Sequence, residues 1–166
     1  DRIEMEDIAD VLSGGNEAVG GGDTLVVNYS AVLGGITVDL SAADQVVTMD
    51  GSANAASQAN FENLDLSSYA NFGAVVTGSD VANTITGTAG VDRIAAGKGN
   101  DIIIVDSGTV ANDDQMNGGL GTDTLQIAAG LTVTIDGDTD IVSVENISFD
   151  AQGTVILTGQ TEGFVI

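Results

Sequence analysis

The stretch Gly118-Gly119-Leu120-Gly121-Thr122-Asp123-Thr124-Leu125-Gln126 decides the fold of this chain. Glycine tolerates positive φ angles and lets neighbouring turns approach closely. In a short strand after the turn, Leu125 would point to the opposite face from its two neighbours. The stretch therefore predicts a tight turn followed by a short strand with one inward side chain.

The same arrangement recurs along the chain at a spacing of nine residues, with one break. The polar residues at the repeated position are Asn83, Asp92, Asp101, Asp114 and Asp123. The apolar residues two positions later are Ile85, Ile94, Ile103, Met116 and Leu125. A unit of this size cannot bury its own apolar residue, so stacked units must build the core together.

These units resemble the nonapeptide G-G-x-G-x-D-x-U-x of the repeats-in-toxin (RTX) family. Residues 118–126 match every fixed position of that pattern. Residues 96–104 depart from it only by Ala96 in place of the first glycine. The resemblance covers about residues 77–127. It implies an all-β fold, a parallel β-roll or β-solenoid of short strands with glycine-rich calcium-binding turns.

Two further units depart more from the family pattern. Residues 87–95 carry Thr88 in place of the second glycine. Residues 77–86 form a unit one residue too long and carry Asn83 in place of the aspartate. These departures leave the phase of the repeat intact, so the units are expected to stack with the others.

Each turn offers a cation its backbone carbonyls and one carboxylate. The chain has no Cys and no His, which leaves oxygen ligands, the set that calcium prefers. The residues that the resemblance implies as calcium ligands are Asn83, Gly90, Asp92, Gly97, Gly99, Asp101, Asp114, Gly119, Gly121 and Asp123. A weaker echo of the pattern between residues 10 and 25 adds Asp10 and Asp23.

The spacing of the repeat also predicts the register of the coils. In the family's β-roll two nonapeptides make one coil, so residues 18 apart, such as Asn83 and Asp101, should lie side by side. Across the break, the next two pairs are 22 residues apart: Asp92 with Asp114, and Asp101 with Asp123. One insertion of four residues explains both offsets. We expect it to form a bulge at about residues 106–113 that leaves the register unchanged.

The charge excludes some partners. The chain carries 25 Asp and Glu against 3 Lys and Arg, a net charge of -22 at pH 7. Such a chain would repel nucleic-acid phosphates. It has no apolar run of about 18 residues, so no membrane insertion is expected.

The same charge makes the stack dependent on a cation. Two carboxylates about 4 Å apart repel each other by on the order of 4 kcal/mol at an intermediate dielectric. Calcium at about 100 times its dissociation constant adds about 2.7 kcal/mol per site. Because extracellular calcium modules bind at about 0.1–1 mM, we expect the chain to fold outside the cell. Together with the family resemblance, this implies a secreted or cell-surface bacterial protein.

The rest of the chain is expected to continue the solenoid, as a single elongated domain over residues 1–166. An alternative is two related halves, at about 10–78 and 79–166, because residues 23–27 resemble residues 123–127 and later segments recur in the same order.

Three segments outside the repeat carry separate expectations. Residues 1–12 fit either a short helix or a pair of short strands. Residues 41–60, rich in Ala, Ser and Asn, indicate a long loop or an outward excursion. Residues 162–166 either resemble the acidic and apolar tail of type I secreted proteins or mark a fragment boundary.

The sequence therefore predicts a calcium-dependent structural module of a surface layer, filament or adhesin, with copies of itself or other surface proteins as partners. The alternative is a non-catalytic binding or folding-assist module of a secreted enzyme. Catalysis is not expected, because the periodic acidic residues are accounted for by metal binding.

Overall fold

The computed structural model of the chain describes residues 1–6, 10, 12–15, 22–29, 33–69, 72–106, 114–135 and 139–157. Within these residues every regular element is a β-strand, as predicted, and there is no helix that could cross a membrane. In chain order the strands are β1 (Arg2–Met5), β2 (Leu12–Ser13), β3 (Thr24–Val27), β4 (Ile36–Asp39), β5 (Val46–Met49), β6 (Ser52–Ala53), β7 (Gln58–Ala59), β8 (Asn63–Asp65), β9 (Ala74–Ser79), β10 (Thr84–Thr86), β11 (Arg93–Gly97), β12 (Ile102–Val105), β13 (Gln115–Asn117), β14 (Thr124–Ile127), β15 (Thr132–Ile135), β16 (Ile141–Val142), β17 (Asn146–Phe149) and β18 (Thr154–Leu157).

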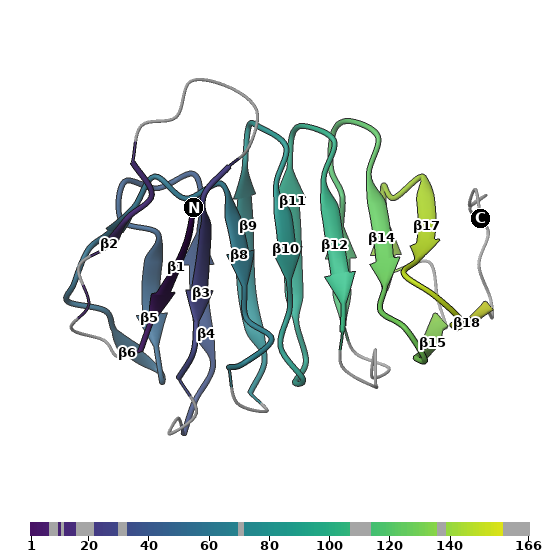
Figure 1. The fold of residues 1–166 in the computed structure, drawn as a ribbon, viewed down its shortest axis with the longest axis horizontal. Helices are drawn as coiled ribbons and strands as arrows, with labels where there is room; N and C mark the ends of the chain where they lie inside the picture. Colours follow the sequence, from purple (N-terminus) through teal and green to yellow (C-terminus); the bar gives the residue numbers. More distant parts are fainter. Residues whose placement is uncertain are drawn as a thin grey trace.

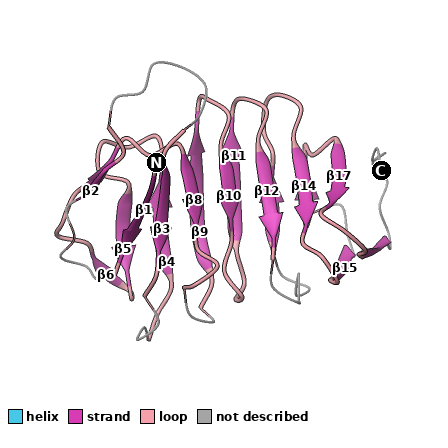
Figure 2. Ribbon diagram, viewed as in Figure 1, coloured by secondary structure: helices cyan, strands magenta, loops and turns pink. Residues whose placement is uncertain are grey.

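Two sheets of seven strands run along the length of the molecule (Figure 1). The first sheet has the order β1-β3-β8-β10-β12-β14-β17, and the second has the order β16-β13-β11-β9-β4-β5-β6. Two small sheets pair β15 with β18 and β2 with β7. In the region of the repeat the chain alternates between the two large sheets, and short loops join β9 to β10, β10 to β11, β11 to β12 and β13 to β14 (Figure 2). The predicted parallel β-solenoid is therefore confirmed.

The register of the strands confirms both predicted offsets. Thr84 of β10 pairs with Ile102 of β12, 18 residues later. Ile102 in turn pairs with Thr124 of β14, which is 22 residues later. The second sheet shows the same offset of 22 where Arg93 pairs with Gln115. The insertion therefore leaves the register unchanged, although residues 107–113, where we expected the bulge, lie outside the described part of the chain.

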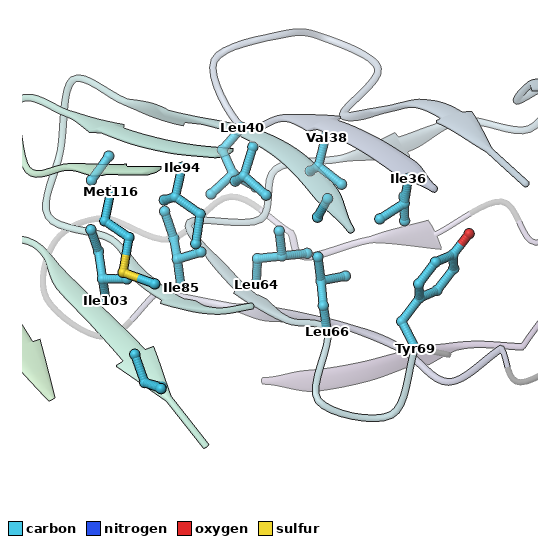
Figure 3. Packing of buried hydrophobic residues seen from close by; sticks show 14 of the residues in the cluster. Ile36, Val38, Leu40, Leu64, Leu66, Tyr69, Ile85, Ile94, Ile103 and Met116 are labelled. Carbon is cyan, nitrogen blue, oxygen red and sulfur yellow. The ribbon is translucent and has the colours of Figure 1, made fainter. Parts of the chain in front are cut away.

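The core lies between the two sheets. The apolar residues two positions after each repeated polar residue are all buried, with at most 4% of their surface exposed: Ile85, Ile94, Ile103, Met116 and Leu125. In Figure 3, Ile85 and Ile103 of the first sheet approach Ile94 and Met116 of the second. Short strands rich in β-branched residues suit this arrangement, because one face of each strand packs inward.

The amino-terminal segment is a strand pair rather than a helix in the described residues. Arg2–Met5 form β1, which pairs in parallel with β3 from Arg2–Thr24 to Met5–Val27. Met5 is fully buried in the core. Main-chain hydrogen bonds to β3 replace those that a helix would have made, so Arg2–Met5 are not helical. Residues 7–9 and 11 lie outside the description.

Residues 41–60 are not a long loop, contrary to expectation. They contain β5 and β6, which extend the second sheet by antiparallel pairing beyond β4, and β7, which pairs with β2. The buried side chains of Val46 and Met49 explain the difference. These apolar residues give β5 an inward face, and β4 supplies a neighbouring strand, so the weak sequence periodicity understated the order of this segment.

Candidate calcium-binding turns

The turns that lead into the first sheet form one edge of the solenoid, which we call the first edge. The predicted ligands on this edge are Asn83, Gly97, Gly99, Asp101, Gly119, Gly121 and Asp123. A ladder of hydrogen bonds links them. The backbone N–H of Asn83 donates to Asp101 Oδ1, and that of Asp101 donates to Asp123 Oδ1, both at 2.8 Å. Parallel stacking thus places each aspartate against the next coil.

The turns that lead into the second sheet form the opposite, second edge. The predicted ligands here are Gly90, Asp92 and Asp114. Asp92 N–H donates to Asp114 Oδ1 at 2.8 Å, so this edge carries a ladder of its own. The structure therefore separates the predicted ligands into two groups on opposite sides of the core.

On the first edge, two carboxylates are incompletely satisfied. Asp101 and Asp123 are each 1% exposed. Their Oδ2 atoms are buried and have no hydrogen-bond partner. A buried polar atom without a partner costs about 1–3 kcal/mol, and more when it is charged. A hard cation would remove this cost, so these residues fit the calcium that the sequence pattern implies.

The glycines on the first edge bring the backbone of neighbouring turns into close contact. Gly119 has a φ of +97°, and a Cβ at this position would overlap the carbonyl oxygen of Gly97. Hydrogen bonds of 2.9 Å run from Leu120 N–H to Gly97 O and from Gly99 N–H to Leu120 O. Only glycine combines this φ with this approach. Backbone carbonyls therefore stack along the same edge as the aspartates.

In the described residues no three acidic side chains form a cluster that could hold a metal. Acidic side chains alone would therefore not complete a coordination shell. Calcium takes about 6–8 oxygen ligands and accepts backbone carbonyls among them. The carboxylates Asp101 and Asp123, together with carbonyls of the glycine turns, are the residues that would hold it.

Two turns satisfy their polar residue without a cation. Thr88 donates its N–H to Asp92 Oδ2 at 2.8 Å and its hydroxyl to Asp92 Oδ1 at 2.7 Å. In the same way, Ser79 donates its N–H to Asn83 Oδ1 at 2.8 Å and its hydroxyl at 3.1 Å. Both hydroxyl residues stand four positions before the polar residue, where Gly97 and Gly119 stand in the other turns.

Sequence reasoning missed this role of Ser79 and Thr88. The signal was present, because each replaces the second glycine of the nonapeptide. A glycine there has no side-chain donor, whereas a serine or threonine supplies one. The residue at this position therefore decides whether the carboxylate or amide is satisfied within its own turn.

The burial of these carboxylates changes their pKa. Burial, opposed by the hydrogen bond from Asn83 and aided by the charge of Asp123, raises the pKa of Asp101 to about 6. Burial also raises the pKa of Asp92, while hydrogen bonds from Thr88 and Ala74 lower it. Without a bound cation, the negative charge buried on the first edge is therefore energetically unfavourable.

Two glutamates also join the ladder of the first edge, and the sequence reasoning did not assign them a role. Glu145 Oε2 accepts the N–H of Asp123 at 2.8 Å, and Glu62 Oε2 accepts the N–H of Asp23 at 2.8 Å. Each is followed by Asn and an apolar residue, a recurrence visible in the sequence. Asp23 thus lies on the first edge, whereas Asp10 Oδ2 accepts the N–H of Glu6 at 2.8 Å.

Comparison with known families agrees with this geometry. The family described as RTX calcium-binding nonapeptide repeat (4 copies) matches residues 77–109 and 111–125. No curated protein and no solved structure matches the chain significantly. The matched residues contain both ladders of the repeat region, and repeats of this family bind calcium. Residues 77–109 and 111–125 therefore belong to the family of RTX calcium-binding nonapeptide repeats, built here into a parallel β-solenoid.

Proposed function

We propose that this chain is a structural module of a secreted or cell-surface bacterial protein, which folds when it meets calcium outside the cell. The observation that carries the proposal is the pair of buried, unpartnered Oδ2 atoms of Asp101 and Asp123. Around them the backbone is hydrogen-bonded from coil to coil. Calcium would complete the interactions that the protein itself leaves open.

The proposed sites lie on the first edge. Their ligands are the carboxylates of Asp101 and Asp123 with carbonyls of the turns that contain Gly97, Gly99, Gly119 and Gly121. On the second edge, Asp92 already accepts three hydrogen bonds from protein groups. We therefore expect no calcium ion at Gly90 and Asp92. Asp114 and Asn83 remain predicted ligands, although no unpartnered carboxylate oxygen supports them as it does Asp101 and Asp123.

Circular dichroism in calcium and in chelator tests the proposal. Calcium is expected to increase the β-sheet signal of the wild-type chain, and the variants Asp101→Asn and Asp123→Asn should need more calcium for the same change. Asp80→Asn serves as the control, because this side chain is 77% exposed and pairs with Lys98 at the surface. A β-sheet signal that is the same in chelator would overturn the proposal.

We also propose that the module assembles with copies of itself. The first sheet ends at β1 and β17, each of which has one neighbouring strand in that sheet. Edge strands present backbone groups that can pair with another chain. A second copy could therefore extend the solenoid, as a surface layer or filament would require.

The alternative function is a folding-assist or binding module of a secreted enzyme. It would also bind calcium but would remain monomeric. Sedimentation with and without calcium distinguishes the two, because only the assembling module forms high-mass species. In either case the module is proposed to be non-catalytic, with the ladder aspartates engaged in hydrogen bonds and metal binding.

A further inference from the structure

We infer that Gly14, Gly15 and Asp23 form a further calcium-binding turn, outside the residues that match the RTX repeats. This inference rests on the proposed function, because it assigns to Asp23 the role proposed for Asp123. The two turns lie on the same first edge, one leading into β3 and the other into β14. The two turns share three structural features.

The first feature is the free carboxylate oxygen. Among the described residues, the buried side-chain atoms without a hydrogen-bond partner belong to Asp23, Asn54, Asp101 and Asp123. Three of them are carboxylate oxygens, and each is Oδ2 of an aspartate only 1% exposed. The other oxygen of Asp23, Oδ1, contacts the amino group of Asp1. Asp101 Oδ1 is likewise occupied, by the N–H of Asn83.

The second feature is the glycine pair beside this oxygen. Gly15 has a φ of +102°, close to the +97° of Gly119 and the +109° of Gly97. Gly14 lies against Asp23 Oδ2 and the carbonyl oxygen of Asn60. Gly118 lies in the same way against Asp123 Oδ2 and the carbonyl oxygen of Ser143. Among the described residues no Ser or Thr hydroxyl donates to Asp23, unlike at Asp92.

The third feature is the set of hydrogen bonds that each turn makes with the next coil. Glu62 Oε2 accepts the N–H of Asp23, as Glu145 Oε2 accepts that of Asp123, both at 2.8 Å. The carbonyl of Asp23 accepts the N–H of Asn63 at 2.9 Å, and that of Asp123 accepts the N–H of Asn146 at 3.0 Å. Asn60 and Ser143 both have positive φ, 61° and 53° respectively.

The nonapeptide pattern does not contain this turn, because its parts are further apart in sequence. Gly15 precedes Asp23 by eight residues, whereas Gly119 precedes Asp123 by four. The coil length is nevertheless the same, since β1 pairs with β3 at an offset of 22, as β12 does with β14. One carboxylate oxygen among backbone carbonyls is a ligand set for a hard divalent cation, and calcium is the member of this class that accepts it. The division of the chain into related halves stays a prediction.

Calcium stoichiometry of purified variants tests the inference. The wild-type chain, Asp23→Asn, Asp123→Asn and the surface control Asp80→Asn would be titrated with calcium by isothermal calorimetry. Asn preserves the Oδ1 acceptor and removes the charge at Oδ2. We expect Asp23→Asn to lose one calcium ion per chain relative to the wild type, and Asp80→Asn to lose none.

The outcomes separate the inference from the proposed function. Loss of an ion in Asp123→Asn but not in Asp23→Asn would overturn the inference and leave the proposed function intact. A wild-type chain that binds no calcium would overturn both. Should Asp23→Asn fail to fold, amide NMR of the wild type replaces it. Calcium is then expected to shift the Gly14, Gly15 and Asp23 amides, and unchanged amides at saturation would refute the site.

Discussion

Replacing Asp101 by Asn is expected to affect stability differently with and without calcium. Asp101 is buried, its Oδ1 accepts the N–H of Asn83 at 2.8 Å, and its Oδ2 has no hydrogen-bond partner. Burial, with a smaller contribution from the charge of Asp123, raises its pKa from 3.8 to about 6. Asn preserves the Oδ1 acceptor and removes the charge, so it removes both the cost of burial and the cation ligand.

The magnitudes decide the expected signs. The pKa shift corresponds to at most about 3 kcal/mol of unfavourable charge burial at neutral pH, before solvent screening is allowed for. The Asn amide in place of Oδ2 would cost about 1–3 kcal/mol for its unpaired N–H groups. These effects nearly cancel, so in chelator the variant should match the wild type or exceed it by up to about 2 kcal/mol. With calcium at about 100 times its dissociation constant, the variant should lack about 2.7 kcal/mol.

Urea unfolding followed by circular dichroism measures both differences, in chelator and in saturating calcium. Sucrose in both buffers keeps the calcium-free protein folded enough to measure. Asp80→Asn is the matched control, since it also removes one negative charge but lies at the surface. If Asp101→Asn is destabilised equally in both buffers, Asp101 is a hydrogen-bonding residue of the turn and the reasoning is refuted.

Burial raises the pKa of Asp101 to about 6, so folding favours its protonated form. The free energy of unfolding of the calcium-free protein should therefore rise by up to about 1 kcal/mol between pH 7 and pH 5, and this gain should be lost as the pH rises through about 6. Urea unfolding at constant salt that shows a loss of stability on acidification would contradict this. Gly119→Ala should lower the free energy of unfolding by about 3 kcal/mol or more, measured by thermal unfolding. The control is Gly130→Ala, because Gly130 has a φ of +81° but nothing within 4 Å, and it should cost about 1–2 kcal/mol. Equal losses would exclude close stacking of the turns as the cause. Thr88→Val should lose about 1–2 kcal/mol in calcium and in chelator alike, with unchanged calcium stoichiometry; a lost ion would show that Asp92 binds calcium.

Much of the fold could be predicted from spacing alone. The positions of the inward residues Ile85, Ile103 and Leu125 follow from alternation along a strand, which is a local property of the backbone. The offsets of 18 and 22 follow from counting residues between repeated aspartates. The antiparallel strands within residues 41–60 could not be predicted in this way, because their order depends on β4 as a neighbour.

The sequence by itself determined the solenoid, its coil lengths and the chemical class of its ligands, because these depend on turn-forming glycines, strand alternation and a lack of Cys and His. Only the tertiary structure decided which carboxylates remain without partners. Asp92 and Asp123 occupy equivalent positions in the repeat, yet Thr88 satisfies the first and no protein group satisfies Oδ2 of the second. At Asp23 the surrounding groups come from Gly14 and Glu62, and the latter is 39 residues away. Hydrogen bonding depends on which donors meet in space, and sequence spacing does not contain that information.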